Sequence, residues 1–336
     1  MKCGERSFIF DNSVYVRSGY TIVGDKEGKG NYGNYFDLVL SDDLWGQKSY
    51  ERAECKMHKE AILGAMQKAG INESDIGLML AGDLMNEIVG SGFAARDFAC
   101  GFMGLYNACA TYGEALLLGG MLISAGYEKY VTCSSSSHFS TAERQYRYPL
   151  ELGTQRTPTS QWTVTGAGCT VLSAEFGEQG FPLVTAGTIG RVIDMGVEDE
   201  GNMGGAMAPA AADTIITHLR DTKRDASYYD LILTGDLGKY GKELLQYILA
   251  DEGYDGINNL QDCGAIYFTE DQKTEQGGSG AGCANTLFNG YFLKKMLQGK
   301  YSKILLVPTG ALLSRDTPLQ KETIPSIAHA IAFEKK

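Results

Sequence analysis

Histidine is scarce in this sequence, with four in 336 residues: His58, His138, His218 and His329. Few residues are therefore available to a mechanism that depends on an imidazole. None of the eight cysteines forms a CxxC pair or has a histidine at metal-ligand spacing. The cysteines are thus predicted to be free thiols in a reducing compartment, and the sequence predicts neither a metal site nor a cofactor.

Long apolar segments are missing as well. The longest run, residues 115–125, is interrupted by Gly119 and Gly120 and is much shorter than the roughly 20 residues of a membrane-spanning helix. The chain does not begin with the charged start, apolar core and cleavage site of a secretory signal. Basic residues are outnumbered, 30 against 41 acidic, and the net charge of −11 disfavours a nucleic-acid partner. We expect a protein that stays inside the cell and has no transmembrane segment.

Glycine is abundant: 43 residues, clustered beside short apolar stretches. Glycine allows tight loops and close backbone packing. With 43% hydrophobic and 21% charged residues, the composition is that of a globular protein. The glycine-rich run at 277–285 lacks the lysine of a P-loop and the spacing of a dinucleotide site, so no nucleotide cofactor is expected.

Several segments occur twice. The motif IGLMLAGDL recurs as YDLILTGDL, each after a helical pattern, and a later pair begins with Cys-Ala at a helix start and ends in a strand. The repeated pairs are 76–84 with 229–237, 109–133 with 283–307, and, more weakly, 166–177 with 327–336. Because the offset between copies grows from 153 to 174, we place an insertion of about 21 residues in the second half, at 258–276.

Buried strands that alternate with amphipathic helices indicate an α/β fold with mostly parallel strands, covered by helices on both faces. The repeats predict two duplicated halves, 1–180 and 181–336, related by a pseudo-twofold axis. The helices that begin at Cys109 and Cys283 should pack near that axis. No Pro- or Ser-rich linker separates the halves, so they should form one fused globular body.

Cys109 stands just before a predicted helix that begins with small residues. An open α/β sheet places its ligands at the loops that follow its strands. The aligned N–H groups at a helix N-terminus favour a thiolate and can bind a carboxylate. Cys109 is therefore a candidate nucleophile or ligand-site residue. The alternative is a small buried thiol at the start of a helix.

Polar residues follow two of the predicted strands. A run of hydroxyls and an imidazole after the strand KYVT offers many hydrogen-bond donors, although a solvated turn has the same composition. Its members of interest are Ser135, Ser136, Ser137 and His138. Asp83 and Asp236 end the two Gly-Asp strands, where a carboxylate either caps the next segment or faces a pocket.

Longer motifs carry a resemblance to known proteins. The duplicated layout, with Cys-Ala and a Gly-rich loop opening the two central helices, resembles the thiolase and ketoacyl synthase superfamily. More closely, runs from about residue 37 to 330 resemble the stage V sporulation protein AD family of endospore-forming bacteria; they are AGDLMNE, ACATYGEAL, TAERQYRYPLELGTQRTPTSQWTVTGAG, GNMGGAMAPAAADTI, TGDLGKYG, GGSGAGC and PTGALLS. The resemblance implies a thiolase-like five-layer αβαβα fold, with Cys109 at the position of the acyl-accepting thiol.

The same resemblance shows what this chain lacks for catalysis. Thiolase-type enzymes place a histidine, or a histidine and an asparagine, opposite the thiol from two loops of the second half. Here the corresponding loops, 235–238 and 279–283, contain no histidine. Because the usual base and oxyanion donor are missing, we expect a thiolase-like protein that is not an enzyme. The alternative is a residual ketosynthase- or thiolase-type acyltransferase that uses Cys109.

For the sporulation family, the implied ligand is dipicolinate, pyridine-2,6-dicarboxylate. The implied role is that of a soluble dipicolinate-binding component of the membrane complex that moves dipicolinate during sporulation and germination. Such a protein would lie peripherally on the cytoplasmic face of the spore inner membrane, bound to membrane subunits of the complex. A pure scaffold with a vestigial pocket is a further alternative, and a homodimer is left open.

The ligand site is expected where the two strand ends meet the helix start. Its expected residues are Asp83, Cys109, Ser135, Ser136, Ser137 and His138. Arg144 or Arg147 could supply positive charge for the dianion. Alternatively, the ligand arrives as its neutral calcium chelate, and Asp83 then faces the metal.

Overall fold

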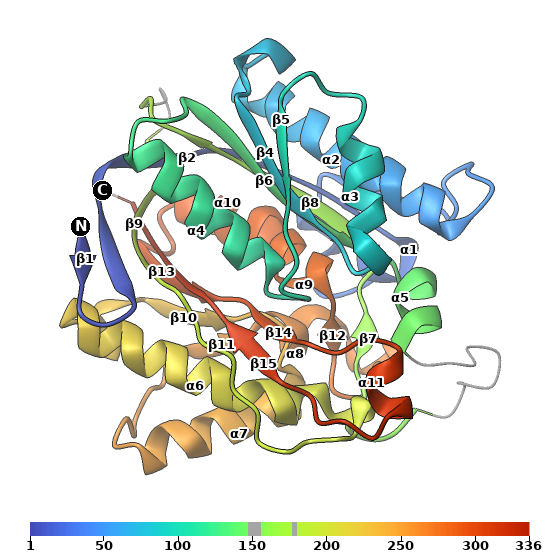
Figure 1. The fold of residues 1–336 in the computed structure, drawn as a ribbon, viewed down its shortest axis with the longest axis vertical. Helices are drawn as coiled ribbons and strands as arrows, with labels where there is room; N and C mark the ends of the chain where they lie inside the picture. The colour runs from blue at the N-terminus through green and yellow to red at the C-terminus, as the bar shows by residue number, and fades with distance from the viewer. Residues whose placement is uncertain (147–155, 177–179, 336) are drawn as a thin grey trace.

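The computed structural model describes residues 1–146, 156–176 and 180–335 (Figure 1). Within these residues, twelve strands form one large sheet whose path is β11-β10-β13-β16-β9-β2-β8-β6-β4-β5, with β1 and β3 attached to β2. The strands are β1 (Lys2–Cys3), β2 (Ser7–Val23), β3 (Leu38–Val39), β4 (Leu78–Gly82), β5 (Gly101–Gly104), β6 (Tyr130–Ser137), β8 (Gly166–Ser173), β9 (Leu183–Thr188), β10 (Leu231–Thr234), β11 (Leu260–Asp262), β13 (Lys303–Val307) and β16 (Ala330–Glu334). Two short sheets pair β7 (Trp162–Thr163) with β12 (Gly278–Ser279), and β14 (Thr309–Ala311) with β15 (Ser326–Ala328).

The helices pack on both faces of the large sheet. They are α1 (Asp25–Gly28), α2 (Tyr50–Ala69), α3 (Val89–Ala95), α4 (Thr111–Ser124), α5 (Phe139–Tyr146), α6 (Met203–Thr222), α7 (Gly238–Asp251), α8 (Cys263–Tyr267), α9 (Ala281–Leu287), α10 (Leu293–Leu297) and α11 (Asp316–Leu319). A π-helical turn, Phe288–Phe292, joins α9 to α10. The predicted helix start at Cys283 lies two residues earlier, at Ala281.

The large sheet is symmetric about its central pair, β2 and β9. Outward from β2 follow β8, β6, β4 and β5, and outward from β9 follow β16, β13, β10 and β11. On each side the first two pairings are antiparallel and the next two are parallel. The repeated sequence pairs fall on matching strands of this order. The predicted division at residue 180 falls between β8 and β9.

The predicted insertion at 258–276 is correct only in part. Residues 260–262 form β11, which pairs with β10 as β5 pairs with β4. Part of the additional length lies instead in α7, which has 14 residues where α3 has 7. The rest includes α8, which follows β11 directly. With three residues, β11 is too short to show an alternating sequence pattern, so it could not be recognised within the predicted insertion.

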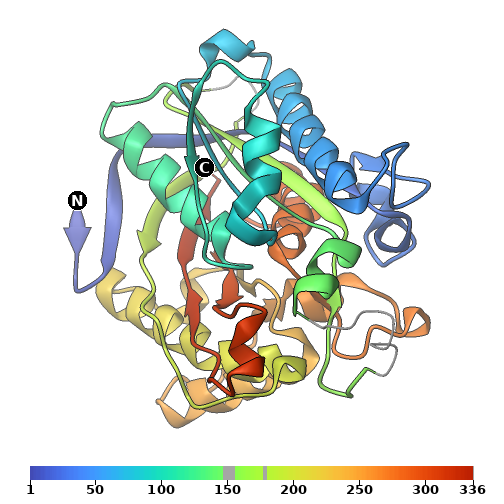
Figure 2. The ribbon, with the colours of Figure 1, turned by 45° about the vertical axis from the view of Figure 1, so that its right-hand side comes forward.

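Alternating side chains along the strands produce the five layers. In β4, Leu80 joins a central core with α4 and α9, whereas Met79 joins the core beneath α2. In β10, Leu233 joins the same central core, whereas Ile232 joins the core beneath α6 and α7. Figures 1 and 2 show the resulting arrangement, with α2 and α3 at one end, α6 and α7 at the other, and α4, α9 and α10 between the two halves of the sheet.

The apolar run 115–125 lies almost entirely in α4, between the two halves of the sheet, which explains its composition. Its two glycines bring the helix close to the strands: a Cβ at Gly119 would lie 2.8 Å from the sulfur of Cys133, and one at Gly120 would lie 2.7 Å from the ring of Phe10. Across the described parts of the chain, no helix has both the length and the apolar character that a membrane span requires.

Candidate functional site

Cys109 lies in the tight turn before α4. Ala108, just before it, has φ of 49°, in the left-handed region that costs a non-glycine residue about 1–3 kcal/mol. Thr111 holds the turn, because its hydroxyl donates to the carbonyl oxygen of Ala108 (2.7 Å) and accepts from the amide of Asn107 (2.9 Å). Backbone strain of this kind is concentrated at functional sites, and here it directs Cys109 toward a cavity.

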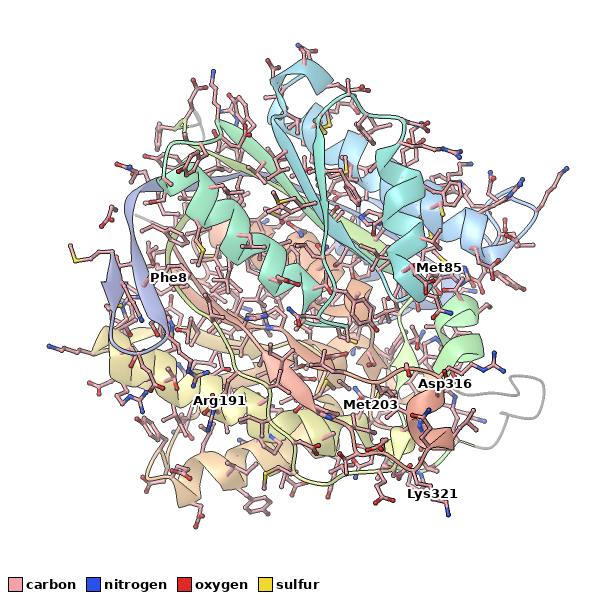
Figure 3. All side chains as sticks on the ribbon, viewed as in Figure 1. Phe8, Met85, Arg191, Met203, Asp316 and Lys321 are labelled. Atoms are coloured by element: carbon pink, nitrogen blue, oxygen red, sulfur yellow. The ribbon has the colours of Figure 1, made fainter. Side chains whose placement is uncertain are left out.

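The cavity beside Cys109 is small, about 30 Å³, and both halves of the chain contribute to it. Its lining residues are Leu84, Ala108, Cys109, Ala142, Glu143, Thr163, Met203, Ser279, Gly280, Ala311 and Leu313. Leu313 also lines a larger outer cleft of about 630 Å³, together with the segment 85–88. Figure 3 labels Met203, at the start of α6, which lines the cavity, and Met85, after the end of β4, which lines the outer cleft.

Asp236, which follows β10, is fully buried beside this cavity. Its carboxylate accepts hydrogen bonds from the hydroxyls of Thr309 and Ser279, both at 2.8 Å, and from the amide of Gly280 at 3.0 Å. Gly280 has φ of 108°, and a Cβ there would lie 2.7 Å from the hydroxyl of Ser137, so only glycine fits. Despite its three donors, burial raises the pKa of Asp236 to about 6.

The Cys109 thiol is poorly suited to be a nucleophile. Burial and the neighbouring Asp236 carboxylate raise its pKa well above the ordinary value, so the sulfur is protonated at neutral pH. The loop 235–238, which contains no histidine, thus places the carboxylate of Asp236 near the thiol. The Ser279 hydroxyl and the Gly280 amide of the second loop donate to that carboxylate; they also lower the pKa of the Cys109 thiol, but by less than burial and Asp236 raise it.

The two Gly-Asp strands use their aspartates differently. Asp83 is a capping residue: its carboxylate accepts from the amide of Met85 (2.9 Å) and from the amide and hydroxyl of Ser91 (both 2.6 Å), so it does not line the cavity. In the second half Asp262 takes the capping role at the start of α7, which leaves Asp236 available to face Cys109. Of the two alternatives for these aspartates, Asp83 follows the first, whereas Asp236 follows neither fully: it contacts Cys109 from behind the cavity wall and does not line the cavity itself.

Replacing Asp262 should destabilise the fold strongly. This buried carboxylate accepts from the amides of Leu237, Gly238 and Ala265 at 2.8–2.9 Å. Because an unpaired buried amide costs about 1–3 kcal/mol, Asp262→Ala is expected to lower the free energy of unfolding by about 3–5 kcal/mol in urea denaturation. The exposed Asp230, which caps two amides, is the matched control, since water can replace its side chain. Equal losses for both variants would contradict this account.

The serine run is the end of β6 and not a loop, and every member is buried. Ser135 donates to the carbonyl oxygen of Ala281 at 2.6 Å, and Ser137 donates to that of Val164 at 2.7 Å. Ser136 donates to the carboxylate of Glu54 at 3.0 Å. The prediction that these hydroxyls offer donors to a pocket is therefore wrong: each one joins β6 to a neighbouring layer, and none lines the cavity.

Ser136 belongs to a buried network on the α2 side of the sheet. His58 contacts Ser134 through Nε2 (2.8 Å) and Ser136 through Nδ1 (3.2 Å). Burial raises the pKa of Glu54 to about 8 and lowers that of His58 to about 4, so both are neutral at pH 7. This network therefore brings two uncharged, hydrogen-bonded groups into the interior.

The other histidines are also engaged away from the cavity. His138 donates from Nε2 to the carbonyl oxygen of Asp43 at 2.9 Å. His218 lies within α6 and contacts Thr188 and Tyr229. His329 comes nearest to the Cys109 turn, with Nε2 3.3 Å from the side-chain nitrogen of Asn107, and burial lowers its pKa to about 4. No described histidine lines the cavity.

Of the six expected ligand residues, the structure brings Cys109 alone to the cavity wall. Reasoning from sequence missed Glu143 and Thr163, which lie in the long motif that carries the family resemblance. Arg147 lies outside the described residues, and the side chain of Arg144 is not described. Among the described residues, no three His, Cys, Asp or Glu side chains are placed to hold a metal ion.

Comparison with known proteins places this geometry in context. Residues 4–334 match the family model of stage V sporulation protein AD. Stage V sporulation protein AD of Bacillus subtilis (strain 168) is 40% identical over 332 residues, covering 99% of this chain and 97% of that protein. Cerulenin-bound OleA of Xanthomonas campestris is similar in structure, with a TM-score of 0.64 at 11% identity over 98% of both chains. Human mitochondrial 3-ketoacyl-CoA thiolase with CoA has a TM-score of 0.61 at 10% identity, over 98% of this chain and 99% of that one. The predicted thiolase-like fold is confirmed.

Proposed function

The chain belongs to the stage V sporulation protein AD family, and we propose that it binds dipicolinate at the Cys109 cavity without catalysing acyl transfer. One observation carries this proposal. The cavity lies beside Cys109, the residue that the resemblance puts at the position of the thiolase thiol, but Asp236 stands near that sulfur and no described imidazole lines the walls. This combination supports a site that binds a ligand over one that activates the thiol.

The walls offer a flat aromatic dicarboxylate both apolar and polar surfaces. Leu84, Ala142 and Leu313 give the apolar contact that a pyridine ring requires. Thr163 and Cys109 add a hydroxyl and a thiol to the wall, which could donate to the ligand's oxygens once they leave their present acceptors, Glu143 and Asp236. This combination of mostly apolar walls with a few polar groups is typical of small-molecule sites.

The cavity must widen to admit dipicolinate, because about 30 Å³ accommodates roughly two water molecules. The thin wall between the cavity and the outer cleft is the natural place for this. It contains Leu84 and Leu313, and the adjoining Glu87 and Ile88 both have positive φ, at 56° and 48°. Leaving that strained conformation offsets part of the cost of opening.

Isothermal titration of the whole chain with dipicolinate tests the proposal. We expect saturable binding with one site, and weaker binding of picolinate, which has a single carboxylate. Ser136→Ala is the matched control variant, because its hydroxyl contacts Glu54 away from the cavity. Absence of saturable binding at pH 6 to 8, for both dipicolinate and its calcium chelate, would favour the scaffold alternative.

We expect no condensation or thiolysis with acyl-CoA substrates. Burial and Asp236 hold the Cys109 sulfur in the thiol form, and thiols react much more slowly than thiolates. Incubation with acyl-CoA followed by peptide mass spectrometry should leave the Cys109 peptide unmodified. A Cys109-linked acyl thioester that turns over would revive the acyltransferase alternative.

We further propose that the protein acts at the cytoplasmic face of the spore inner membrane, bound to membrane subunits of a dipicolinate-moving complex. Family membership supports this role. Co-purification with membrane subunits, and its loss after a salt or alkaline wash, would test it. A homodimer stays a prediction for sedimentation analysis.

A further inference from the structure

Glu143 and Arg156 form an ion pair at the edge of the cavity. Glu143, on α5, lines the cavity and is 3% exposed, and its Oε1 lies 3.2 Å from Nη2 of Arg156, which is 14% exposed. The hydroxyl of Thr163, another lining residue, lies 3.4 Å from the same oxygen. Both charges are therefore shielded from bulk water. A shielded ion pair interacts more strongly than a pair that is exposed at the surface.

The guanidinium of Arg156 is held from two further sides. Its Nη1 donates to the carbonyl oxygen of Gln161 at 2.7 Å. Its charged carbon lies 4.5 Å above the ring of Trp162, which stacks on Phe139 at 3.9 Å. These contacts fix the position of the guanidinium independently of Glu143. A change of acceptor at Nη2 consequently requires little movement of the arginine.

An anionic ligand meets two acidic side chains at this cavity, Asp236 and Glu143. Arg156 is the described cation that is bonded directly to a lining residue. Arginine presents several N–H groups in a planar fork that suits carboxylates. Since Glu143 already accepts from Nη2, the protein's own carboxylate occupies the place that a ligand carboxylate would need.

We propose that Arg156 selects dicarboxylate ligands and that Glu143 is an internal competitor for it. When a dicarboxylate enters, one of its carboxylates replaces Glu143 as the acceptor of the Nη2 hydrogen bond, and Glu143 turns away. This inference rests on the proposed function. It identifies Arg156 as the residue that distinguishes a dicarboxylate from a monocarboxylate. It also identifies Glu143 as a residue that lowers the affinity for the ligand.

Opposite changes are expected for the two partners. Arg156→Gln should weaken dipicolinate binding by about 10- to 100-fold, the range for a hydrogen bond to a charged group, and should reduce the preference for dipicolinate over picolinate by at least about tenfold. Glu143→Gln should strengthen dipicolinate binding several-fold, because it removes both a competitor and a like charge. The control is Lys26→Gln, since the Lys26 ammonium lies 4.0 Å from the centre of the Trp162 ring and donates to the carbonyl oxygen of Gln272 rather than to Glu143.

Isothermal titrations of the full chain with dipicolinate and picolinate measure these changes, with thermal unfolding as the check on folding. Because Arg156→Gln removes a cation from a buried carboxylate, the double variant Glu143→Gln with Arg156→Gln is included; it should fold and lack the preference. If the parent binds dipicolinate and the folded double variant keeps the full preference, the inference is wrong while the proposed function stands. Weaker binding by folded Glu143→Gln would overturn the competition. If the parent chain does not bind dipicolinate, both the proposed function and this inference are wrong.

Discussion

Cys109→Trp abolishes dipicolinate binding, whereas Cys109→Ala changes affinity by less than about tenfold. An indole at this position exceeds the space in a cavity of about 30 Å³ and projects across it toward the second half. Alanine removes one weak S–H donor and leaves the remaining walls in place. The expected difference between the two variants is at least 100-fold in Kd, measured by isothermal titration.

The control for this experiment is folding. A large side chain in the Cys109 turn can overpack the core at a cost of about 1–3 kcal/mol, so unchanged cooperativity in thermal unfolding is required. Cys283→Ala provides a matched thiol deletion, because Cys283 is buried in α9 and does not line the cavity. Parent-like binding by a folded Cys109→Trp variant would move the ligand site elsewhere.

Dipicolinate affinity rises as the pH is lowered from 8 to 6. Burial raises the pKa of Asp236 to about 6, so at pH 8 this carboxylate is ionised and repels a dianion in the adjoining cavity. A bound dianion raises that pKa further, and binding therefore takes up a proton. The affinity should increase by up to about tenfold per pH unit and level off below pH 6, where Asp236 is already protonated.

The calcium chelate is expected to show the opposite trend, since it is neutral and its metal favours an ionised Asp236. Titrations at pH 6, 7 and 8, in buffers of different ionisation enthalpy, give both affinity and proton uptake. Asp236→Asn should remove the pH dependence for both ligands. Identical slopes in parent and Asp236→Asn would show that another group titrates.

The same pKa shift sets the sign of a stability effect. The folded state holds the Asp236 proton up to about pH 6, whereas the ordinary value is 3.8. The folded chain thus binds more protons than the unfolded chain between about pH 4 and 6, and the Asp236 contribution to the free energy of unfolding falls as the pH rises through this window. The contribution is at most about 3 kcal/mol.

The fold was predictable because its evidence is repeated along the chain. The motif that ends in Gly-Asp occurs twice, and the two copies gave β4 and β10, which occupy equivalent places in the symmetric sheet. The turn at Cys109 was predictable from local composition, since small residues open α4. Both features depend on residues that are neighbours in sequence.

The walls of the site were not predictable in the same way. Four consecutive serines have the composition of a turn, and the groups that bury them come from distant segments, including Glu54, Val164 and Ala281. The different uses of Asp83 and Asp236 also depend on Asp262, a capping residue that the first half does not match. Partners separated by 25 or more positions leave no local pattern.

Protection of Cys109 from a small thiol reagent tests the central claim most directly. Methyl methanethiosulfonate is small and uncharged. Because Cys109 is held in the slow-reacting thiol form, its modification at pH 8 is followed by peptide mass spectrometry until it is complete, with the partly exposed Cys55 and Cys100 as internal references. The account predicts that saturating dipicolinate slows modification of Cys109 at least tenfold and leaves the two reference thiols unchanged. Equal rates at Cys109 with and without saturating dipicolinate would contradict it.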